Sequence, residues 1–197
     1  MDIDYTKISE QDIKLTSEEA NFLGPELVLE NCTINSNCDR DTLTIAGLTM
    51  IGGDFIQHAR LSDFHFSRAH LINVKFTGNF IGCDYGDWEK LDRSSVSGCD
   101  FSEAILDGCR FLNCDMHGIQ LPKWPNFAIL NPINARSVVL SRKWPSEIGI
   151  TLDVYTDNDP ECVAICGNAE ILAKEDKISL DDLRELLMTL PGINIQD

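Results

Sequence analysis

The stretch CDFSEAILDGCRFLNCDMHGIQL, residues 99–121, repeats its large apolar residues at an unusual interval. One stands at every fifth position: Phe101, Leu106, Phe111, Met116 and Leu121. An α-helix repeats at about 3.6 residues and a β-strand at about 2. A single long helix or strand therefore cannot place these side chains together.

The same interval extends backwards to residue 51, and fourteen of the fifteen positions from 51 to 121 are apolar. The earlier positions are Ile51, Ile56, Leu61, Phe66, Leu71, Phe76, Ile81, Gly86, Leu91 and Val96. A smaller residue often stands two places before the large one, with a polar residue between them. That alternation is typical of a short strand. The two remaining residues must turn a corner, so four units form a square coil, and stacked coils form a solenoid.

The units CDFSE, AILDG, CRFLN and CDMHG, residues 99–118, resemble those of the pentapeptide-repeat proteins. This resemblance implies a right-handed quadrilateral β-helix with about 20 residues per coil. It is strong over 99–121 and fair over 54–81, with looser echoes between 27 and 48 and between 128 and 140. The frame slips at 49–54, where Gly52 and Gly53 intervene, and again between 82 and 95. We expect about six irregular coils.

The chain is expected to be mainly β, with a cap at each end of the solenoid. We assign residues 1–26 to an N-terminal capping segment, 27–142 to the pentapeptide-repeat β-helix and 143–197 to a small α/β cap. In the first segment, Thr16 and Glu19 have the spacing of a helix cap, and Gly24–Pro25 would end that helix.

The C-terminal cap is expected to contain one strand and two helices. The pattern predicts a strand over 147–155, a helix over 159–175 and a second helix over 179–192, opened by Ser179 and Asp182 as a capping box. The apolar stripe of the last helix consists of Leu183, Leu186, Leu187 and Leu190. We expect this stripe to cover the end of the solenoid; the alternative is a homodimer contact.

The net charge of −16 lies mostly at the two ends of the chain. Residues 1–30 carry −6, residues 31–150 only −2, and residues 151–197 carry −8. Such an acidic protein is not expected to bind nucleic acid directly, which needs a basic face. No run of 18 apolar residues predicts a membrane span. The acidic start lacks the layout of a secretion signal, so we expect a cytoplasmic protein with reduced cysteines.

Neither a metal, a cofactor nor catalysis is predicted. Four cysteines stand at the small inward position of the repeat, where a thiol packs as a compact apolar group: Cys32, Cys99, Cys109 and Cys114. Cys162 and Cys166 lack the further ligands of a zinc site. His58, His65, His70 and His117 fall mostly at outward or corner positions, and no phosphate loop, GxSxG or HExxH motif occurs. We expect a protein that is not an enzyme.

Five residues are candidates for binding a protein partner. The tripeptide KWP occurs at 123–125 and again at 143–145, and its candidate members are Lys123, Trp124, Lys143 and Trp144. One coil of separation would place the two rings side by side as an aromatic and basic patch. The alternative is that both rings pack under the C-terminal segment. Trp88, in the irregular stretch 82–93, is the fifth candidate because it falls on a loop held by a rigid scaffold.

A rod filled with Phe and Leu offers surface rather than an interior pocket. We therefore expect a protein that blocks a protein target, in the manner of an immunity protein neutralising its cognate toxin. The alternative is implied by another branch of the pentapeptide-repeat family, which this sequence resembles. Members of that branch mimic duplex DNA and bind topoisomerases such as gyrase. A near-neutral repeat segment weakens that alternative. A structural scaffold is the third hypothesis.

Overall fold

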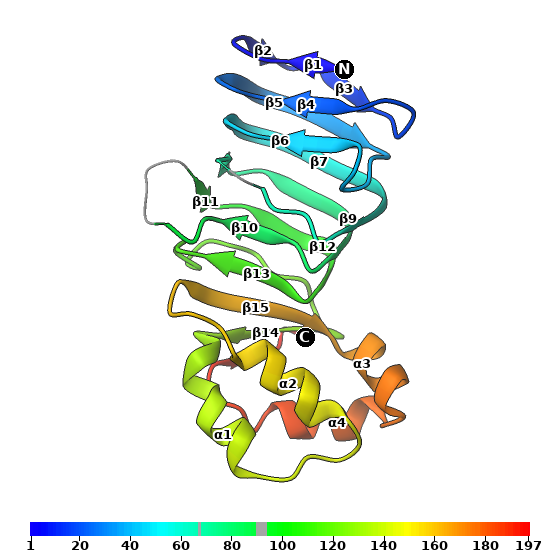
Figure 1. Cartoon of the computed structure of the whole chain (residues 1–197), viewed down its shortest axis with the longest axis vertical. Coiled ribbons are helices and arrows are strands. Elements are labelled where there is room, and N and C mark those ends of the chain that lie inside the picture. The colour runs from blue at the N-terminus through cyan, green and yellow to red at the C-terminus, as the bar shows by residue number, and fades with distance from the viewer. Residues whose placement is uncertain (67, 90–93) are drawn as a thin grey trace.

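The computed structural model of this protein describes residues 1–66, 68–89 and 94–197. Short strands stack into a solenoid from the N-terminus, and the helices gather at the opposite, C-terminal end (Figure 1). The chain is 44% strand and 18% helix, and the solenoid makes about 4 turns. The predicted mainly β solenoid is confirmed, with fewer turns than the six imperfect coils that the repeats suggested.

Strands of successive coils pair in parallel, so each side of the coil is a sheet that runs along the rod. Its ladders are β2–β5–β7–β8–β11, β3–β5–β7–β9–β12 and β1–β4–β6. The strands are β1 (Asp2–Ile3), β2 (Lys7–Ser9), β3 (Asp12–Leu15), β4 (Asn21–Leu23), β5 (Leu27–Ser36), β6 (Leu43–Ile45), β7 (Leu48–Ser62), β8 (His70–Ile72), β9 (Lys75–Ile81), β10 (Asp84–Gly86), β11 (Ser95–Ser97), β12 (Asp100–Asp107) and β13 (Cys109–Leu112).

Two columns of aromatic rings fill the solenoid. They are Phe55–Phe76–Phe101 and Phe66–Tyr85–Phe111. Neighbouring ring centroids lie 5.5 and 4.6 Å apart in the first column and 4.8 and 5.3 Å apart in the second. All six rings are fully buried. Because parallel pairing places each ring over its counterpart in the next coil, the core is continuous along the axis.

The coils differ in length, which corrects part of the predicted five-residue frame. Phe55 pairs with Phe76, whereas Phe80 pairs with Leu106, so the later coil is the longer of the two. The frame therefore shifts locally, and Met50 and Phe55 point inward where Ile51 and Ile56 were expected.

Three further positions of the five-residue frame are not seen as fully buried large residues. Ile81 is half-buried, because the fully buried residue is its neighbour Phe80. Met116 is also only half-buried. Leu91 lies outside the described residues. The remaining described large residues of the frame from 61 to 121 are buried as predicted.

One corner of each coil is turned by a residue with left-handed backbone. Asn31, Gly52, Asn73 and Gly98 stack there with φ of 50°, 65°, 55° and 62°. Asparagine and glycine tolerate this conformation best. The next residue, Gly53, must be a glycine, because a Cβ there would lie 2.0 Å from the Cys32 carbonyl oxygen. The glycines at the predicted frame slip are therefore the corner itself.

The prediction of an N-terminal helix that begins at Thr16 is wrong. Residues 16–20 form a tight turn, and the Asn21 side-chain amide donates to the carbonyl oxygens of Thr16 and Glu19, both at 2.8 Å. Residues 1–26 instead contribute β1 to β4 to the solenoid. The missed signal is the continuation of the five-residue interval at Ile3, Ile8 and Ile13.

The parallel coils end near residue 121, earlier than the predicted boundary at 142. Beyond them lie β14 (Asn126–Leu130), η1 (Pro132–Ala135), α1 (Arg136–Ser141), α2 (Ile148–Thr156), β15 (Cys162–Asn168), α3 (Ala169–Asp176), α4 (Leu180–Leu187) and β16 (Ile193–Asn194). β15 pairs antiparallel with both β13 and β14, in the order β10–β13–β15–β14–β16. The last coil therefore keeps a hydrogen-bonded neighbour. None of the described helices is both long and apolar enough to cross a membrane.

Two of the three elements predicted in the cap are corrected. Residues 147–155 alternate like a strand, yet α2 buries Ile148, Leu152 and Tyr155 at helical spacing and exposes Ile150 and Val154. The helix expected over 159–175 is strand β15 followed by α3, because β13 and β14 offer β15 a partner on each side.

The third element is confirmed: α4 begins after Ser179, whose hydroxyl accepts from the Asp182 backbone N–H at 3.1 Å. Three leucines of its stripe, Leu183, Leu187 and Leu190, are buried, and Leu186 is half-buried. They belong to a second hydrophobic cluster formed by the cap. Their burial within one chain does not support a homodimer contact on this stripe.

All eight cysteines are free thiols. Cys32, Cys99 and Cys109 are fully buried inside the solenoid as predicted, and Cys114 is half-buried. Burial raises the pKa of Cys114 to about 12. Cys162 and Cys166 lie on β15, where they are buried. These thiols pack as small apolar groups.

Replacing Phe111 with Ala should lower the free energy of unfolding by about 3–5 kcal/mol, because it empties one place in an aromatic column. Ile105→Ala, on an exposed β12 side chain, is the control and should change it by less than about 1 kcal/mol. Urea denaturation measures both. A Phe111→Ala loss as small as the control's would contradict the column.

Tyr85→Phe should leave stability unchanged or raise it by up to about 1–2 kcal/mol. The Tyr85 hydroxyl is buried without a hydrogen-bond partner among the described residues, and burial raises its pKa well above the ordinary value. Removing the hydroxyl removes an uncompensated desolvation cost and keeps the ring. A clear fall in the denaturation midpoint would mean that the hydroxyl has a partner in solution.

Candidate functional site

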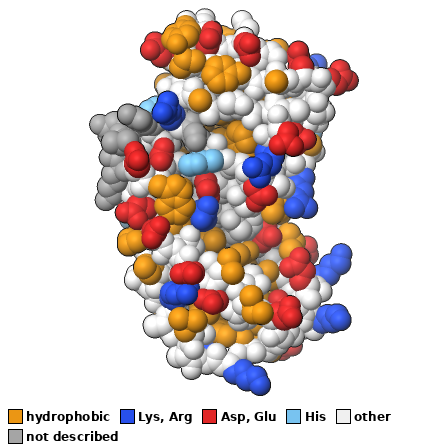
Figure 2. Space-filling model, in the orientation of Figure 1, with side chains coloured by type: hydrophobic (Ala, Val, Ile, Leu, Met, Phe, Trp, Pro, Cys, Tyr) orange, Lys and Arg blue, Asp and Glu red, His pale blue; other side chains and the backbone are white. Residues whose placement is uncertain are grey.

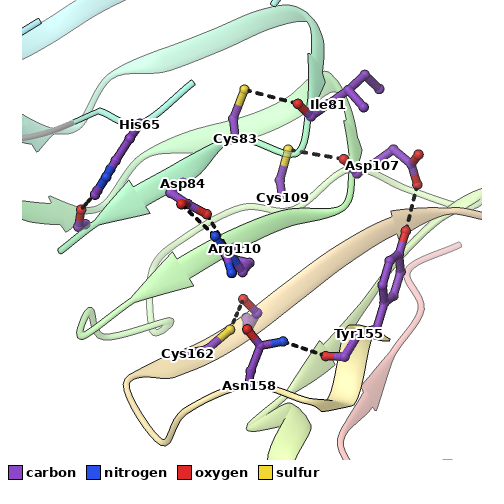
Figure 3. Close-up of polar contacts among 12 residues, drawn as sticks. His65, Ile81, Cys83, Asp84, Asp107, Cys109, Arg110, Tyr155, Asn158 and Cys162 are labelled. Carbon is purple, nitrogen blue, oxygen red and sulfur yellow. Dashed lines mark hydrogen bonds and ion pairs between the residues drawn. The ribbon is translucent and has the colours of Figure 1, made fainter. Parts of the chain in front are cut away.

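A row of polar side chains crosses three coils on the outside of the solenoid. His65 forms an isolated bridge with Asp84, and Asp84 pairs with Arg110 of β13 (Figure 3). Parallel register places the three side chains one above another. The row exists because each residue occupies the outward position between two inward ones.

Asp84 and Arg110 form a bidentate ion pair. Arg110 donates from Nε and Nη2 to the two Asp84 carboxylate oxygens, at 2.7 and 2.8 Å. Asp84 is only 8% exposed. The hydrogen bond to Asp84 raises the pKa of Arg110 above its ordinary value. Because two parallel hydrogen bonds hold the guanidinium, it has one orientation.

Trp88 lies directly over this ion pair. The Arg110 guanidinium carbon is 4.9 Å from the centroid of the Trp88 ring, which is cation–π distance. The Asn113 amide donates to the carbonyl oxygens of Asp87 and Trp88, at 3.0 and 2.9 Å. These two bonds hold the backbone of residues 87 and 88, directly after β10. The half-buried indole is therefore held in place while part of it faces solvent.

We define the Trp88 site as Trp88, Arg110, Asp84 and His65. His65 Nε2 lies 3.0 Å from the carbonyl oxygen of Gly86, which can only accept, so this nitrogen donates. This bond ties the row to the end of β10, next to the loop. Within residues 1–66, 68–89 and 94–197, no group of three or more His, Cys, Asp or Glu is placed to hold a metal ion.

Three acidic residues are close to the Trp88 site along the backbone. Asp87 and Glu89 flank Trp88 in the loop, and the Glu161 carbonyl oxygen accepts from the Asn113 backbone N–H at 2.8 Å. Glu161 thereby belongs to the same neighbourhood. The arrangement offers an aromatic and guanidinium centre, with acidic residues next to it along the backbone. Tryptophan and arginine are among the residue types most enriched at the energetic centres of protein interfaces.

The KWP pair does not form the expected patch. Trp124 lies beside the C-terminal segment: its backbone N–H donates to the carbonyl oxygen of Gln196, and the Arg184 guanidinium is 5.3 Å from its ring. Lys123 donates to the carbonyl of Asp197. Because the parallel coils end before these residues, the interval between the two tripeptides no longer means one coil.

The second KWP element is part of the cap's core. Trp144 is only 8% exposed, and its indole N–H donates to the Val139 carbonyl oxygen at 2.8 Å. The Arg142 guanidinium covers the ring at 3.6 Å. Lys143 is exposed. Both rings pack in the second hydrophobic cluster, so Trp88 alone of the three tryptophans lies on the solenoid's side.

The joint between solenoid and cap was not predicted. Asp107, at the end of β12, accepts from the Tyr155 hydroxyl at 3.0 Å (Figure 3). It also accepts from the Asn168 backbone N–H at 3.0 Å. Burial and the neighbouring carboxylate raise the pKa of Tyr155 well above its ordinary value. Asn168 also donates to Asn126 Oδ1 at 3.1 Å. These bonds fix the cap against the last coils.

Sequence reasoning found Trp88 but missed Asp84 and Arg110. Their separation along the chain exceeds one coil of the expected length, so a regular repeat does not place them together. The available signal was their shared place in equivalent units, Cys83–Asp84–Tyr85 and Cys109–Arg110–Phe111. Opposite charges at equivalent places of neighbouring units indicate a cross-coil ion pair.

Trp144→Ala should lower the free energy of unfolding by about 3–5 kcal/mol, because the ring is buried and its N–H is hydrogen bonded. Trp88→Ala should lower it by less than about 1.5 kcal/mol, since Trp88 is half-buried on a loop. Thermal melts with circular dichroism compare the two. Equal losses would place Trp88 in the structural core and remove it as a site residue.

Comparison with known proteins agrees with the geometry of the coils. The family model described as pentapeptide repeats matches residues 90–121, with 8 copies. That match covers the stretch on which the fold was first inferred. No curated protein and no solved structure matches this chain.

Proposed function

We propose, from the premise that this chain is a pentapeptide-repeat protein, that it binds a protein target and blocks it, as an immunity protein blocks its cognate toxin. The observation that carries the proposal is the Trp88 site. A tryptophan is held over a fixed guanidinium on the side of a rigid rod, outside every hydrophobic column.

A fixed site binds at low entropic cost. The Asn113 bonds hold the backbone of residues 87 and 88, and the Asp84 carboxylate orients Arg110, so these residues have little freedom to lose on association. The coils beneath are rigid because their aromatic columns are closely packed. Such a surface suits tight occlusion of a target better than a chemical step.

Charge favours a basic partner. Asp87 and Glu89 neighbour Trp88 in the sequence, and the charge of Arg110 is offset by Asp84. The chain as a whole has a net charge of −16. An acidic surface accelerates encounter with a basic target and discourages other acidic proteins.

The alternative, a topoisomerase-binding mimic of DNA, has less support from the outward rows. One row runs Asp12, Thr33, Asp54, Lys75 and Asp100 from coil to coil. Duplex DNA carries a charge about every 1.7 Å along its axis, whereas stacked coils offer one place about every 4.8 Å. This row also includes a lysine, and both signs of charge are interspersed on the face in Figure 2.

Capture of the partner tests the proposal. The tagged protein is incubated with lysate and secreted fraction of its source cell, and bound proteins are identified by mass spectrometry. A basic toxin is the expected result, and its activity should fall on addition of this protein. Recovery of topoisomerase subunits would favour the alternative. No specific partner would leave the scaffold hypothesis.

With the partner in hand, Trp88→Ala should weaken binding at least about tenfold, as expected for a tryptophan at an interface centre. Trp124→Ala is the matched control, since Trp124 also lies near an arginine but at the other end, and should change affinity less than about threefold. Calorimetry measures both. Equal affinity of Trp88→Ala and the wild type would exclude the Trp88 site.

A further inference from the structure

The two ends of the solenoid are finished differently. At the C-terminal end, β15 pairs with the last coil and the helices follow it. At the N-terminal end, β1, β2 and β3 each pair with the second coil, and no described strand or helix lies on their other side (Figure 1). This leaves an open strand edge, which proteins usually cover.

The backbone groups on this edge can be identified in β3. The Thr33 N–H donates to the Gln11 carbonyl, and the Asn37 N–H donates to the Leu15 carbonyl, so odd-numbered residues face the second coil. Alternate residues of a strand point their backbone groups in opposite directions. The N–H and C=O groups of Asp12 and Lys14 therefore face away from the solenoid along its axis.

The side chains of β3 are self-complementary about Ile13. Asp12 and Lys14 are exposed, and neither forms an ion pair with a described residue. Ile13 between them points inward and is 6% exposed. Ile3 and Ile8, at the same level of the solenoid, are half-buried. A charge of each sign and an apolar residue thus occupy a short free edge.

We infer that a second copy of this chain covers the edge, with β3 pairing antiparallel to β3 of that copy about a two-fold axis at Ile13. Asp12 then stands opposite Lys14 of the second copy, and Lys14 stands opposite Asp12 of the second copy. Each such pair has its free N–H and C=O groups in position to exchange two hydrogen bonds. Their side chains lie on the same face and pair by charge, while the two Ile13 side chains meet at the end of the core.

A second copy fits this edge better than an unrelated strand, because the sequence Asp–Ile–Lys read antiparallel complements itself. β2 does not: in the same arrangement Lys7 would face Ser9, and Lys7 already pairs with Glu30 at 2.7 Å. The dimer is head to head, so it leaves the Trp88 sites free. This inference is independent of the proposed target.

Net charge opposes the dimer. Residues 1–30 carry −6, and the dimer brings two such ends together. Charges farther apart than about 8 Å are screened at physiological salt, whereas directly opposed pairs are screened much less. Contact pairing should therefore prevail at about 0.15 M salt, and lowering the salt should weaken the dimer.

The experiment is sedimentation velocity of the full chain over a concentration series, with charge variants of β3. The wild type should form a dimer. Asp12→Lys should raise the dimer dissociation constant about tenfold or more, because two lysines would then face each other across the axis, and Lys14→Asp should do the same with two acids. The double variant Asp12→Lys/Lys14→Asp restores opposite charges and should return within about threefold of wild type.

Asp54→Lys is the matched control, because Asp54 stands in the same outward row two coils away and the substitution changes the net charge equally. It should not weaken the dimer. Asp12→Lys also decides between the contact pair and net charge, since reduced overall repulsion would tighten association. A wild type that stays monomeric at the highest concentration of the series, a tighter Asp12→Lys dimer, or a double variant as weak as the single ones would overturn the inference.

Discussion

Parallel pairing of successive coils is the constraint on which this protein depends. A strand spacing of about 4.8 Å leaves room for one layer of side chains per coil, so each inward residue must pack on its counterpart above and below. The columns Phe55–Phe76–Phe101 and Phe66–Tyr85–Phe111 satisfy that requirement with stacked rings. Once the columns are fixed, the outward positions are also fixed in rows, and polar residues meet across coils without long side chains.

The columns tolerate unequal coils, and the longest coil carries the candidate site. Tyr85 and Phe111 stack although they are more than one regular coil apart along the chain. Trp88 follows β10 directly in this coil. The Asn113 amide donates to the Trp88 carbonyl oxygen, and the Trp88 ring lies beside the Arg110 guanidinium. An insertion that would disrupt a compact sandwich here costs the core little, since each corner of a coil is already at the surface.

A solenoid also has to finish its ends. Antiparallel β15 gives the last coil a partner and begins an α/β unit with its own hydrophobic cluster. The first coil has no such partner among the described residues, and its short strands present alternating charge instead. Charged edges discourage indiscriminate pairing and permit a complementary one. Both ends of the solenoid have a strand edge whose backbone groups need a partner or protection. At the C-terminal end β15 pairs with that edge, and at the N-terminal end charged side chains flank it.

The solenoid could be inferred from the sequence alone, because an interval of five is incompatible with a single helix or flat strand and recurs from residue 51 to residue 121. The sequence by itself also determined the buried thiols, the Ser179 cap of α4 and the candidacy of Trp88. The sequence also showed that the frame slips at Gly52 and Gly53, but the structure was needed to show that Met50 and Phe55 point inward in place of Ile51 and Ile56. That α2 is a helix also became clear only from the structure. Its apolar residues stand at every second position of the sequence, which is the pattern of a strand. The pairing of Asp84 with Arg110 could not be predicted from the regular repeat either. Coil length decides which residues face each other, and it is a property of the stacked chain and not of any short stretch within it.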